Sequence, residues 1–414
     1  MQRTAGLSAL AIVGLLAGCA SAGVKPTVVP TTSTSLAPSL SPEPASPTAS
    51  PSPAYPPTST TDAVAFASAQ YGWAIGSACT STSCTFRGAV TETGGKTWGR
   101  SVVIGTHVIT PNGDPFANVD VRFQGNNVWV FGPNIYQSHD NGRTWRQTLS
   151  GPILAVEPYQ GEVWAVTGCS AEYSTACAPR LMVSAVASDT WSVASPQPRF
   201  ALSVAAGATP FVVMERAPDG VAFVAQNTVP PPAQPGGEAV SPQGQLLFTT
   251  TNLGRSWESL PAPCAGIQSI RSIDGVHVWI LCAVPCCTGN WVKSLWTSAD
   301  GGRTWSERSG TDPTQKGSIP FSGSAGNLTV TTAGVGIFGG SSSGGIWRST
   351  DSGSTWHSTW DDDCIMGGDA VSDVWFATAL DGWALTSDSS DPQCPTFLRS
   401  INGGVTWSGL APPF

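Results

Sequence analysis

The side chains that could carry chemistry in this chain are mainly carboxylates, because histidine is scarce. The four histidines are His107, His139, His277 and His357. They are scattered, and no Cys/His group has the spacing of a zinc site, so we expect no metal and no cofactor. No Gly-x-Ser-x-Gly elbow occurs, so a Ser/His/Asp triad is not indicated either.

The densest run of acidic side chains is Asp361, Asp362 and Asp363. Further carboxylates that we expect in neighbouring loops are Glu172, Asp388 and Asp391. Together these groups are a possible patch for a cation or a basic partner. The alternative is that the run is simply solvated, as most runs of like charge are.

Cysteine usage indicates an exported protein. The chain has 11 cysteines, and setting Cys19 aside leaves ten, an even number. In an oxidising compartment that number allows up to five disulfides.

The N-terminus predicts the route of export. An apolar run from Ala5 to Gly18 is too short for a comfortable membrane span but suits the core of a signal peptide. It ends in Leu16-Ala17-Gly18-Cys19, which resembles the bacterial lipobox, and this implies that Cys19 becomes the lipidated first residue. The alternative is an ordinary secretory signal with an incidental cysteine. We therefore expect an extracytoplasmic protein, lipid-anchored to the bacterial cell membrane after removal of residues 1–18.

The segment that follows is expected to be a tether. Of residues 24–60, 10 are proline and 15 are serine or threonine. Such a composition buries too little apolar surface to offset its ordering entropy, so residues 19–61 are predicted to be a disordered linker.

Bulk composition narrows the fold and the partners. Charged residues make up only 11% of the 414 residues, while Gly (46), Pro (34) and Trp (17) are abundant, which is typical of a turn-rich all-β protein. Lys and Arg number 19 against 27 Asp and Glu, a net charge of −8. An acidic chain without a basic stripe is a poor nucleic-acid binder, so we expect no nucleic-acid partner.

An eight-residue stretch recurs seven times and organises residues 62–414. Every copy starts with Ser or Thr, has Ser or Thr at the seventh place and closes in Trp; the third place is Asp or Asn in five copies. These third-place residues are Asp140, Asn252, Asp300, Asp351 and Asn402. The closing residues are Trp98, Trp145, Trp191, Trp257, Trp305, Trp356 and Trp407. Their spacing is 46 to 51 residues, except for 66 before Trp257, where a Pro- and Gly-rich insertion lies at about 229–244.

Each unit also contains strand-like runs ahead of the repeated stretch, for example Val128–Phe131 and Val278–Leu281. A period near 50 residues with four strands per unit predicts a seven-bladed β-propeller with four-stranded antiparallel blades. Two stacked sandwiches are a rival arrangement, but they do not predict an even seven-fold repeat. We expect closure by packing between the first and last blades rather than by strand exchange.

The repeated stretch resembles the Asp-box, or BNR repeat, Ser/Thr-x-Asp-x-Gly-x-Thr-Trp. That motif occurs in sialidases, sortilin-type receptors, some xyloglucanases and the photosystem II stability/assembly factor-like propellers. The runs Gly72-Trp73-Ala74 and Gly382-Trp383-Ala384 are most similar to the last group. Physically the stretch is a turn: short polar side chains bond local backbone amides, Gly takes a conformation costly for other residues, and Trp packs between blades. One or two carboxylates per turn are too few for calcium.

The sialidase resemblance implies three arginines that grip a carboxylate, a Tyr nucleophile with a Glu, and an Asp acid. Arginines outside the repeats include Arg122, Arg180, Arg199, Arg216 and Arg271, and Tyr159 lies near Glu157. The Arg-Ile-Pro signature of those enzymes is missing, since its nearest match is Phe86-Arg87-Gly88. A glycosidase is therefore the minority hypothesis, and it requires these groups, or a carboxylate pair, to meet in the central depression.

Propeller topology predicts where the cysteines meet. Loops between the second and third strands of a blade lie on the same face as the connections between blades. The predicted pairs on this face are Cys79 with Cys84, Cys169 with Cys177, and Cys364 with Cys394. Cys264 is expected to pair with one of Cys282, Cys286 and Cys287, leaving the other two to each other.

The functional prediction is a non-enzymatic binding or assembly scaffold at the cell envelope, with a protein or glycan partner as the resemblance implies. A glycan-binding module is the alternative, and it would show exposed aromatic platforms, with Trp291, Trp296 and Trp360 as candidates. A sialidase-like hydrolase is the other alternative.

Overall fold

A computed structural model describes residues 60–109, 119–168, 178–201, 210–228, 245–285, 291–311, 317–320, 325–332, 334–340, 345–360, 371–386 and 395–414. The chain divides into a unit of residues 1–54 and a unit of residues 55–414, and all described residues belong to the second. The predicted signal peptide, Cys19 and the tether up to residue 59 lie outside the described residues, as do the acidic run and its neighbours. Thr60 and Thr61 of the expected linker belong instead to the first strand, Thr60–Phe66. Six of the cysteines that were predicted to pair also lie outside them, namely Cys169, Cys177, Cys286, Cys287, Cys364 and Cys394.

The first four blades follow one another along the chain. Blade 1 contains β1 (Thr60–Phe66), β2 (Gly72–Cys79), β3 (Ser83–Thr91) and β4 (Val102–Val108). Blade 2 contains β5 (Asp120–Gln124), β6 (Asn127–Phe131), β7 (Asn134–Ser138) and β8 (Arg146–Ser150). Blade 3 contains β9 (Ile153–Tyr159), β10 (Glu162–Thr167), β11 (Arg180–Ala185) and β12 (Ser192–Val193). Blade 4 contains β13 (Pro210–Arg216), β14 (Ala222–Thr228), β15 (Leu246–Thr250) and β16 (Glu258–Leu260).

The remaining three blades also have four strands each. Blade 5 contains β17 (Ile267–Ser272), β18 (Val278–Pro285), β19 (Trp291–Ser298) and β20 (Ser306–Gly310). Blade 6 contains β21 (Ala325–Thr332), β22 (Val335–Gly340), β23 (Ile346–Ser349) and β24 (His357–Trp360). Blade 7 contains β25 (Val371–Phe376), β26 (Gly382–Thr386), β27 (Phe397–Ser400) and β28 (Ser408–Leu410). Among the described residues the one helical segment is a 3₁₀ turn, Pro218–Gly220, and no helix is long and apolar enough to span a membrane.

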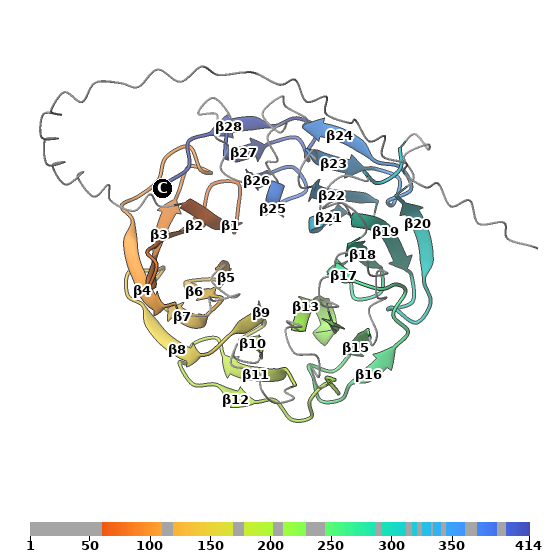
Figure 1. The fold of residues 1–414 in the computed structure, drawn as a ribbon, viewed down its shortest axis with the longest axis horizontal. Coiled ribbons are helices and arrows are strands. Elements are labelled where there is room, and N and C mark those ends of the chain that lie inside the picture. The colour runs from red at the N-terminus through yellow and green to blue at the C-terminus, as the bar shows by residue number, and fades with distance from the viewer. Residues whose placement is uncertain are drawn as a thin grey trace, which may run out of the picture. The chain divides into compact units, whose positions relative to one another are not determined.

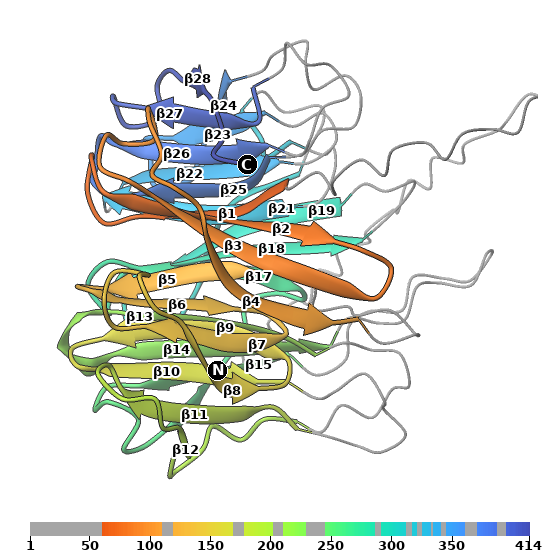
Figure 2. The ribbon, with the colours of Figure 1, turned by 90° about the vertical axis from the view of Figure 1, so that its left-hand side faces the viewer.

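Each blade is an antiparallel sheet of four strands in chain order, and the seven blades surround a common centre (Figure 1). The predicted seven-bladed propeller is therefore confirmed. The first strand of every blade is innermost, and neighbouring first strands contact each other around the centre. Figure 2 shows the strands running roughly along the ring axis, so the connections between strands lie at its two faces.

We name the two faces by their connections. The turn face carries the turns between first and second strands and between third and fourth strands of each blade. The crossover face carries the loops between second and third strands and the connections between blades. Every first strand therefore begins at the crossover face and ends at the turn face.

The ring closes by packing, as expected, because β1–β4 and β25–β28 form separate sheets. The rings of Phe66 and Trp383 stack with centroids 3.6 Å apart, and Trp383 Nε1 donates a hydrogen bond to the Gly94 carbonyl at 3.0 Å. Trp375 Nε1 likewise donates to the Phe66 carbonyl at 2.9 Å. Blade 7 thus buries an apolar face against blade 1 in the same way as any two neighbouring blades.

The core lies between the blades. Strands near the middle of a blade are covered on both sides by neighbours, so they carry continuous apolar runs instead of an alternating pattern. In β6, for instance, all four residues from Val128 to Phe131 are buried. Outer strands face solvent and are more polar, as β8 illustrates.

Candidate functional site

The repeated turn is held together by the side chains at its first and third places. In the fifth blade Ser298 Oγ accepts from the Gly302 amide at 2.8 Å and donates to Asp300 Oδ1 at 2.7 Å. Asp300 Oδ1 also accepts from the Thr304 amide at 2.9 Å, and its Oδ2 accepts from the Thr304 hydroxyl. These donors, the Thr304 hydroxyl first, lower the pKa of Asp300 to about 2.

The charge at the third place is not needed for this geometry. Asn252 Oδ1 accepts from the Ser256 amide at 2.9 Å, while its Nδ2 donates to the Ser256 hydroxyl at 2.8 Å. Asn402 does the same with the amide and hydroxyl of Thr406. A neutral amide therefore makes hydrogen bonds to the same groups as the carboxylate does. The third place of the turn needs a hydrogen-bonding side chain but not a negative charge.

In six of the seven copies of the turn the fourth and fifth places adopt positive φ. At the fifth place Gly142 has φ +72°, and a Cβ there would fall 1.9 Å from Cη2 of Trp73 in the preceding blade. Glycine is therefore required both by the backbone conformation and by the packing of the neighbouring indole. At the fourth place the Asn141 amide donates to the Asn126 carbonyl at 3.0 Å, tying the two turns of the blade together.

The closing tryptophans pack against the preceding blade. Trp356 Nε1 donates to Ser309 Oγ at 3.0 Å, and Trp407 Nε1 donates to Thr359 Oγ1 at 3.2 Å. Indole hydrogen bonds to the preceding blade are also made by Trp191 and Trp305. Ring contacts with the preceding blade are made by Trp98, Trp145 and Trp257. The turn is thus a joint between blades.

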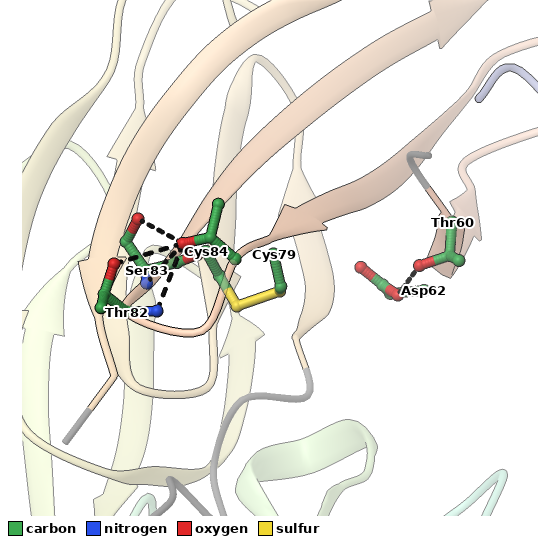
Figure 3. Close-up of a disulfide and its surroundings, with 7 residues drawn as sticks. Thr60, Asp62, Cys79, Thr82, Ser83 and Cys84 are labelled. Atoms are coloured by element: carbon green, nitrogen blue, oxygen red, sulfur yellow. Dashed lines mark hydrogen bonds between the residues drawn. A yellow bond between two sulfur atoms is a disulfide. The ribbon is translucent and has the colours of Figure 1, made fainter. Parts of the chain in front are cut away.

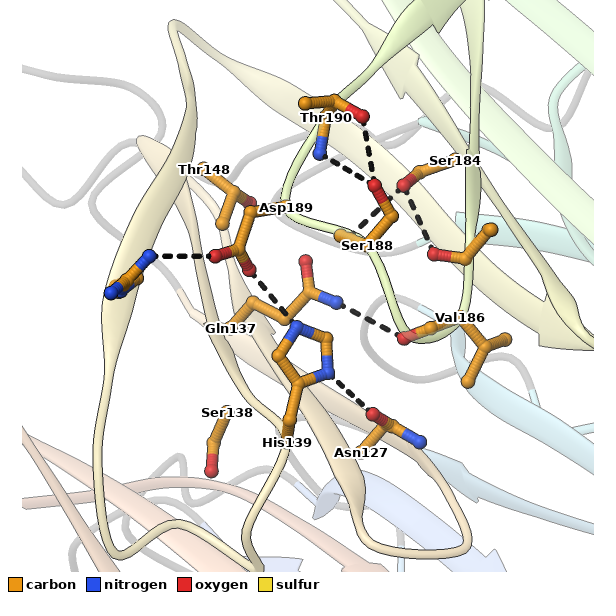
Figure 4. Close-up of polar contacts among 12 residues, drawn as sticks. Asn127, Gln137, Ser138, His139, Thr148, Ser184, Val186, Ser188, Asp189 and Thr190 are labelled. Carbon is orange, nitrogen blue, oxygen red and sulfur yellow. Dashed lines mark hydrogen bonds and ion pairs between the residues drawn. The ribbon is translucent and has the colours of Figure 1, made fainter.

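The third turn departs from the pattern, and side chains of blade 2 contact it (Figure 4). Asp189, at its sixth place, pairs with His139 Nε2 at 3.0 Å and with Arg146 Nη1 at 3.2 Å. Gln137 Nε2 donates to the Val186 carbonyl at 3.3 Å. The sequence pattern did not predict these contacts, because they join residues of two units about 50 positions apart.

Two disulfides lie among the described residues. Cys79 and Cys84 join β2 to β3 across a turn on the crossover face, where Thr80 Oγ1 accepts from the Ser83 amide at 3.1 Å (Figure 3). Cys264 pairs with Cys282, which was one of its three expected partners. The remaining expected pairs involve cysteines outside the described residues.

The centre of the ring holds a belt of charged and polar side chains from the first strands. Two cavities open there, of about 190 Å³ and 170 Å³. Both are lined by Arg122, Glu157, Arg271 and Asn327. The larger one also reaches Phe211 and Gln268 near the starts of their strands, so we call it the crossover-side cavity. The smaller one reaches residues near the ends of their strands, so we call it the turn-side cavity. Its additional lining residues are Glu215, Thr329, Val374, Trp375 and Phe376, together with Asp373.

Arg122 is the most heavily contacted member of this belt. Its Nη1 lies 2.8 Å from both carboxylate oxygens of Asp120, and its Nε lies 3.3 Å from Glu157 Oε1. The guanidinium also lies 5.6 Å from the ring centroid of Trp375. Burial opposes its charge, but the nearby carboxylates, Asp120 first, outweigh burial and raise the pKa of Arg122.

The other half of the belt is centred on Arg271. Its Nη1 lies 3.3 Å from Glu215 Oε2, while Glu215 Oε1 accepts from the Ser272 amide at 3.2 Å. Burial raises the pKa of Glu215 to about 7, and Glu157 adds to the shift although Arg271 opposes it.

Asp373 stands apart from both arginines in its contacts. Its Oδ1 accepts from Asn327 Nδ2 at 2.8 Å, and within the described part of the chain it makes no ion pair. Burial, followed by repulsion from Asp120, raises the pKa of Asp373 to about 6. Across the described residues no three His, Cys, Asp or Glu side chains are close enough to hold a metal ion.

Only some of the sequence-predicted residues meet here. Of the five arginines, Arg122 and Arg271 enter the belt; Arg216 instead lies 4.1 Å over the ring of Trp164 and 5.1 Å over that of Tyr159. Neither Arg180 nor Arg199 lines either cavity. The three candidate glycan-binding tryptophans, Trp291, Trp296 and Trp360, are half-buried.

Sequence reasoning missed four members of the belt, Asp120, Glu215, Asn327 and Asp373. A signal for most of them exists: a charged residue interrupts the apolar run of the first strand in blades 2, 3, 4, 5 and 7. That position faces the ring centre, which is the one place near the core where such a residue can meet partners from other blades.

Comparisons with known proteins find similarity only at the level of structure. No family model matches the chain, and no curated protein matches its sequence. The structure of YCF48 bound to D1 peptide has a TM-score of 0.48 and 16% identity, covering 85% of this chain and 97% of that one. YCF48 from Cyanidioschyzon merolae has a TM-score of 0.49 and 16% identity over 84% and 97%. Polysaccharide lyase Uly1 has a TM-score of 0.48 and 9% identity over 83% and 90%.

Proposed function

We propose that this chain is an exported, lipid-anchored β-propeller that acts as a non-enzymatic binding or assembly scaffold at the bacterial cell envelope. The apolar run and Cys19 support export and anchoring, and the hydrogen-bonded turns support kinship with Asp-box propellers. The ring supplies a rigid support, and the loops on its faces supply contact surfaces for a protein or glycan.

One observation carries the non-enzymatic part of this proposal. Both arginines at the ring centre are already paired with carboxylates of their own or a neighbouring blade, Arg122 with Asp120 and Glu157, and Arg271 with Glu215. A guanidinium whose charge is already compensated by an internal carboxylate attracts the carboxylate of a substrate less strongly than a free guanidinium does. The sialidase arrangement needs three guanidinium groups that are open to the substrate, and the belt is built in the opposite way.

Anchoring is tested by changing the lipidation site in the full-length chain expressed in a bacterium. The unchanged chain should incorporate a palmitate label and fractionate with membranes. Cys19→Ala should abolish the label and release the protein from the membrane fraction. Equal labelling of both chains would show that Cys19 is not the lipid attachment site.

A glycoside hydrolase is the second candidate, because one observation favours it. Glu215, with a pKa near 7, stays partly protonated at neutral pH and has Glu157 as a carboxylate neighbour, which are properties of a general acid beside a base or nucleophile. The purified chain is assayed with fluorogenic sialosides and other glycosides, and with polysaccharides whose new reducing ends are detected. If the chain is a scaffold, none of these substrates should be hydrolysed. Turnover that disappears in Glu215→Gln would establish the hydrolase and overturn the scaffold proposal.

A further inference from the structure

The turn-side cavity has more carboxylates than cations in its lining. Glu157, Glu215 and Asp373 face Arg122 and Arg271. Asp120 adds a fourth carboxylate on the far side of Arg122, at 2.8 Å from its guanidinium. With all six groups ionised the belt therefore carries a net charge of −2, on side chains that are only partly exposed to water.

The surplus is located at one side of the cavity. Arg122 is engaged by Asp120 and Glu157, and Arg271 by Glu215. Asp373 has only the neutral amide of Asn327 as its hydrogen-bond donor among the described contacts. Of the carboxylates in the cavity, Asp373 would therefore be stabilised most by an added positive charge, because the others already have an arginine partner.

The walls around Asp373 also suit a cation. Trp375 and Phe376 line the same cavity, and the Arg122 guanidinium already lies over the Trp375 ring. Aromatic faces attract guanidinium and ammonium groups, most strongly where these are desolvated. The volume of about 170 Å³ slightly exceeds that of a cavity known to hold one benzene molecule, so it accommodates the end of one long side chain.

We propose that the turn-side cavity binds one cationic group, a guanidinium or a primary ammonium, presented by a basic polypeptide segment of the scaffold's partner. This inference rests on the proposed function and names the chemistry of its partner. Asp373 and Glu215 supply the charge that the cation neutralises, and Trp375 supplies a flat apolar wall. An anionic ligand would meet the surplus carboxylates, and a divalent metal would lack three close carboxylates among the described residues.

The proposal has a measurable proton linkage. The charged groups that line the cavity are Arg122 from β5, Glu157 from β9, Glu215 from β13, Arg271 from β17 and Asp373 from β25. Asp120 of β5 lies behind Arg122 and lines the crossover-side cavity. The β21 strand contributes the neutral Asn327 and Thr329. Because Glu215 and Asp373 hold protons with pKa values of about 7 and about 6, a cation that binds near neutral pH displaces them. Binding should therefore release protons and weaken as the pH falls from 8 to 5.

The experiment is a calorimetric titration of the purified chain with acetyl-Gly-Gly-Arg-Gly-Gly amide at pH 8, pH 6.5 and pH 5. Repeating each titration in two buffers of different ionisation enthalpy gives the number of protons released. The same peptide with citrulline in place of arginine has the same shape without the charge. We expect the arginine peptide to bind at least tenfold more tightly at pH 8 than at pH 5, with proton release near pH 6.5, and the citrulline peptide not to bind.

Two variants and a control test whether the peptide binds in the turn-side cavity. Asp373→Asn keeps the contact to Asn327 and should weaken arginine-peptide binding about tenfold, as should Glu215→Gln. Glu258→Gln, in the outer strand β16 beside Arg303, removes an exterior carboxylate and should leave binding unchanged. Equal binding of the arginine and citrulline peptides, or equal loss in all three variants, would overturn the cavity assignment. If the peptide does not bind at all while an envelope partner is still retained by the anchored chain, this inference fails and the scaffold proposal stands.

Discussion

At the scale of single residues, the repeated turn depends most on the glycine at its fifth place. Gly142 combines positive φ with a Cβ position that is already occupied by the buried indole of Trp73. A side chain there must displace a ring that is fixed by its own packing between blades. The same site in the sixth blade, Gly353, faces Leu295 at 2.0 Å, so the constraint recurs.

Gly142→Ala is therefore expected to lower the free energy of unfolding by about 3 kcal/mol, because backbone strain and overpacking add. Gly125→Ala is the matched control: it has φ +60°, but nothing lies within 4 Å of its Cβ position. That control should lose only about 1 kcal/mol, the cost of the left-handed conformation alone. Urea unfolding followed by tryptophan fluorescence measures both, and equal losses would show that the contact with Trp73 does not matter.

The buried carboxyl groups of the belt predict a pH dependence of stability. The pKa of Glu215 is raised from its ordinary 4.5 to about 7, so between these values the folded chain binds more protons than the unfolded chain. Stability should then be full below about pH 4.5 and should decline as the pH rises through 7. The size of the effect is on the order of 3 kcal/mol at most.

The measurement is the melting temperature between pH 5 and pH 8 for the unchanged chain and for Glu215→Gln. The variant has no carboxyl group to ionise at this position, so its melting temperature should fall less over this range. Glu258→Gln, which changes an exposed carboxylate, should leave the slope unchanged. A slope that is the same in all three chains would contradict the assignment of this titration to Glu215.

At the scale of elements, the third place of the turn should tolerate asparagine but not alanine. Asp351 accepts bonds from the Thr355 amide and hydroxyl and from Ser349 Oγ, and Asn252 and Asn402 make equivalent bonds in their own turns. Asp351→Asn should change stability by a few tenths of a kcal/mol, and Asp351→Ala should lower it by about 1 kcal/mol. Thermal unfolding compares the two variants; equal destabilisation would mean that the carboxylate charge is required.

The elements themselves could be predicted from the sequence because their signals are local. Each turn is specified within eight residues, and each blade is built from consecutive strands, so seven copies of the turn sufficed to predict seven blades. The charged belt could not be predicted in this way. Arg122, Glu157 and Arg271 were visible as charged residues, but their meeting depends on how three different blades arrange their first strands around one centre.

The third turn also depends on contacts between blades that the sequence did not predict. Its sequence has lost the Gly and Asp of the repeat, and the structure replaces them with His139, Arg146 and Gln137 of the preceding blade. Contacts between units compensate for what the local sequence lacks, and a comparison of repeats within one sequence does not reveal such partners.

At the scale of the whole molecule, the ring is closed by side chains and not by a shared strand. Phe66 and Trp383 are fully buried and stacked at the junction of blades 1 and 7. If this junction opened, two blades would each expose an apolar face, and the ring would acquire two unprotected ends. The stability of blades 1 and 7 should therefore depend on this one contact more than on any exposed residue of either blade.

Trp383→Ala tests this dependence. Losing the buried indole and its hydrogen bond to Gly94 should lower the free energy of unfolding by about 3–5 kcal/mol. Leu380→Ala, an exposed residue of the same blade, should change it by less than about 0.5 kcal/mol. Hydrogen exchange locates the effect: because the indole packs on blade 1, amides of β1 and β2 should lose protection together with those of β25 and β26. Protection lost in blade 7 alone would mean that blade 1 is stable without its partner, and that the ring does not need to be closed to hold its first blade.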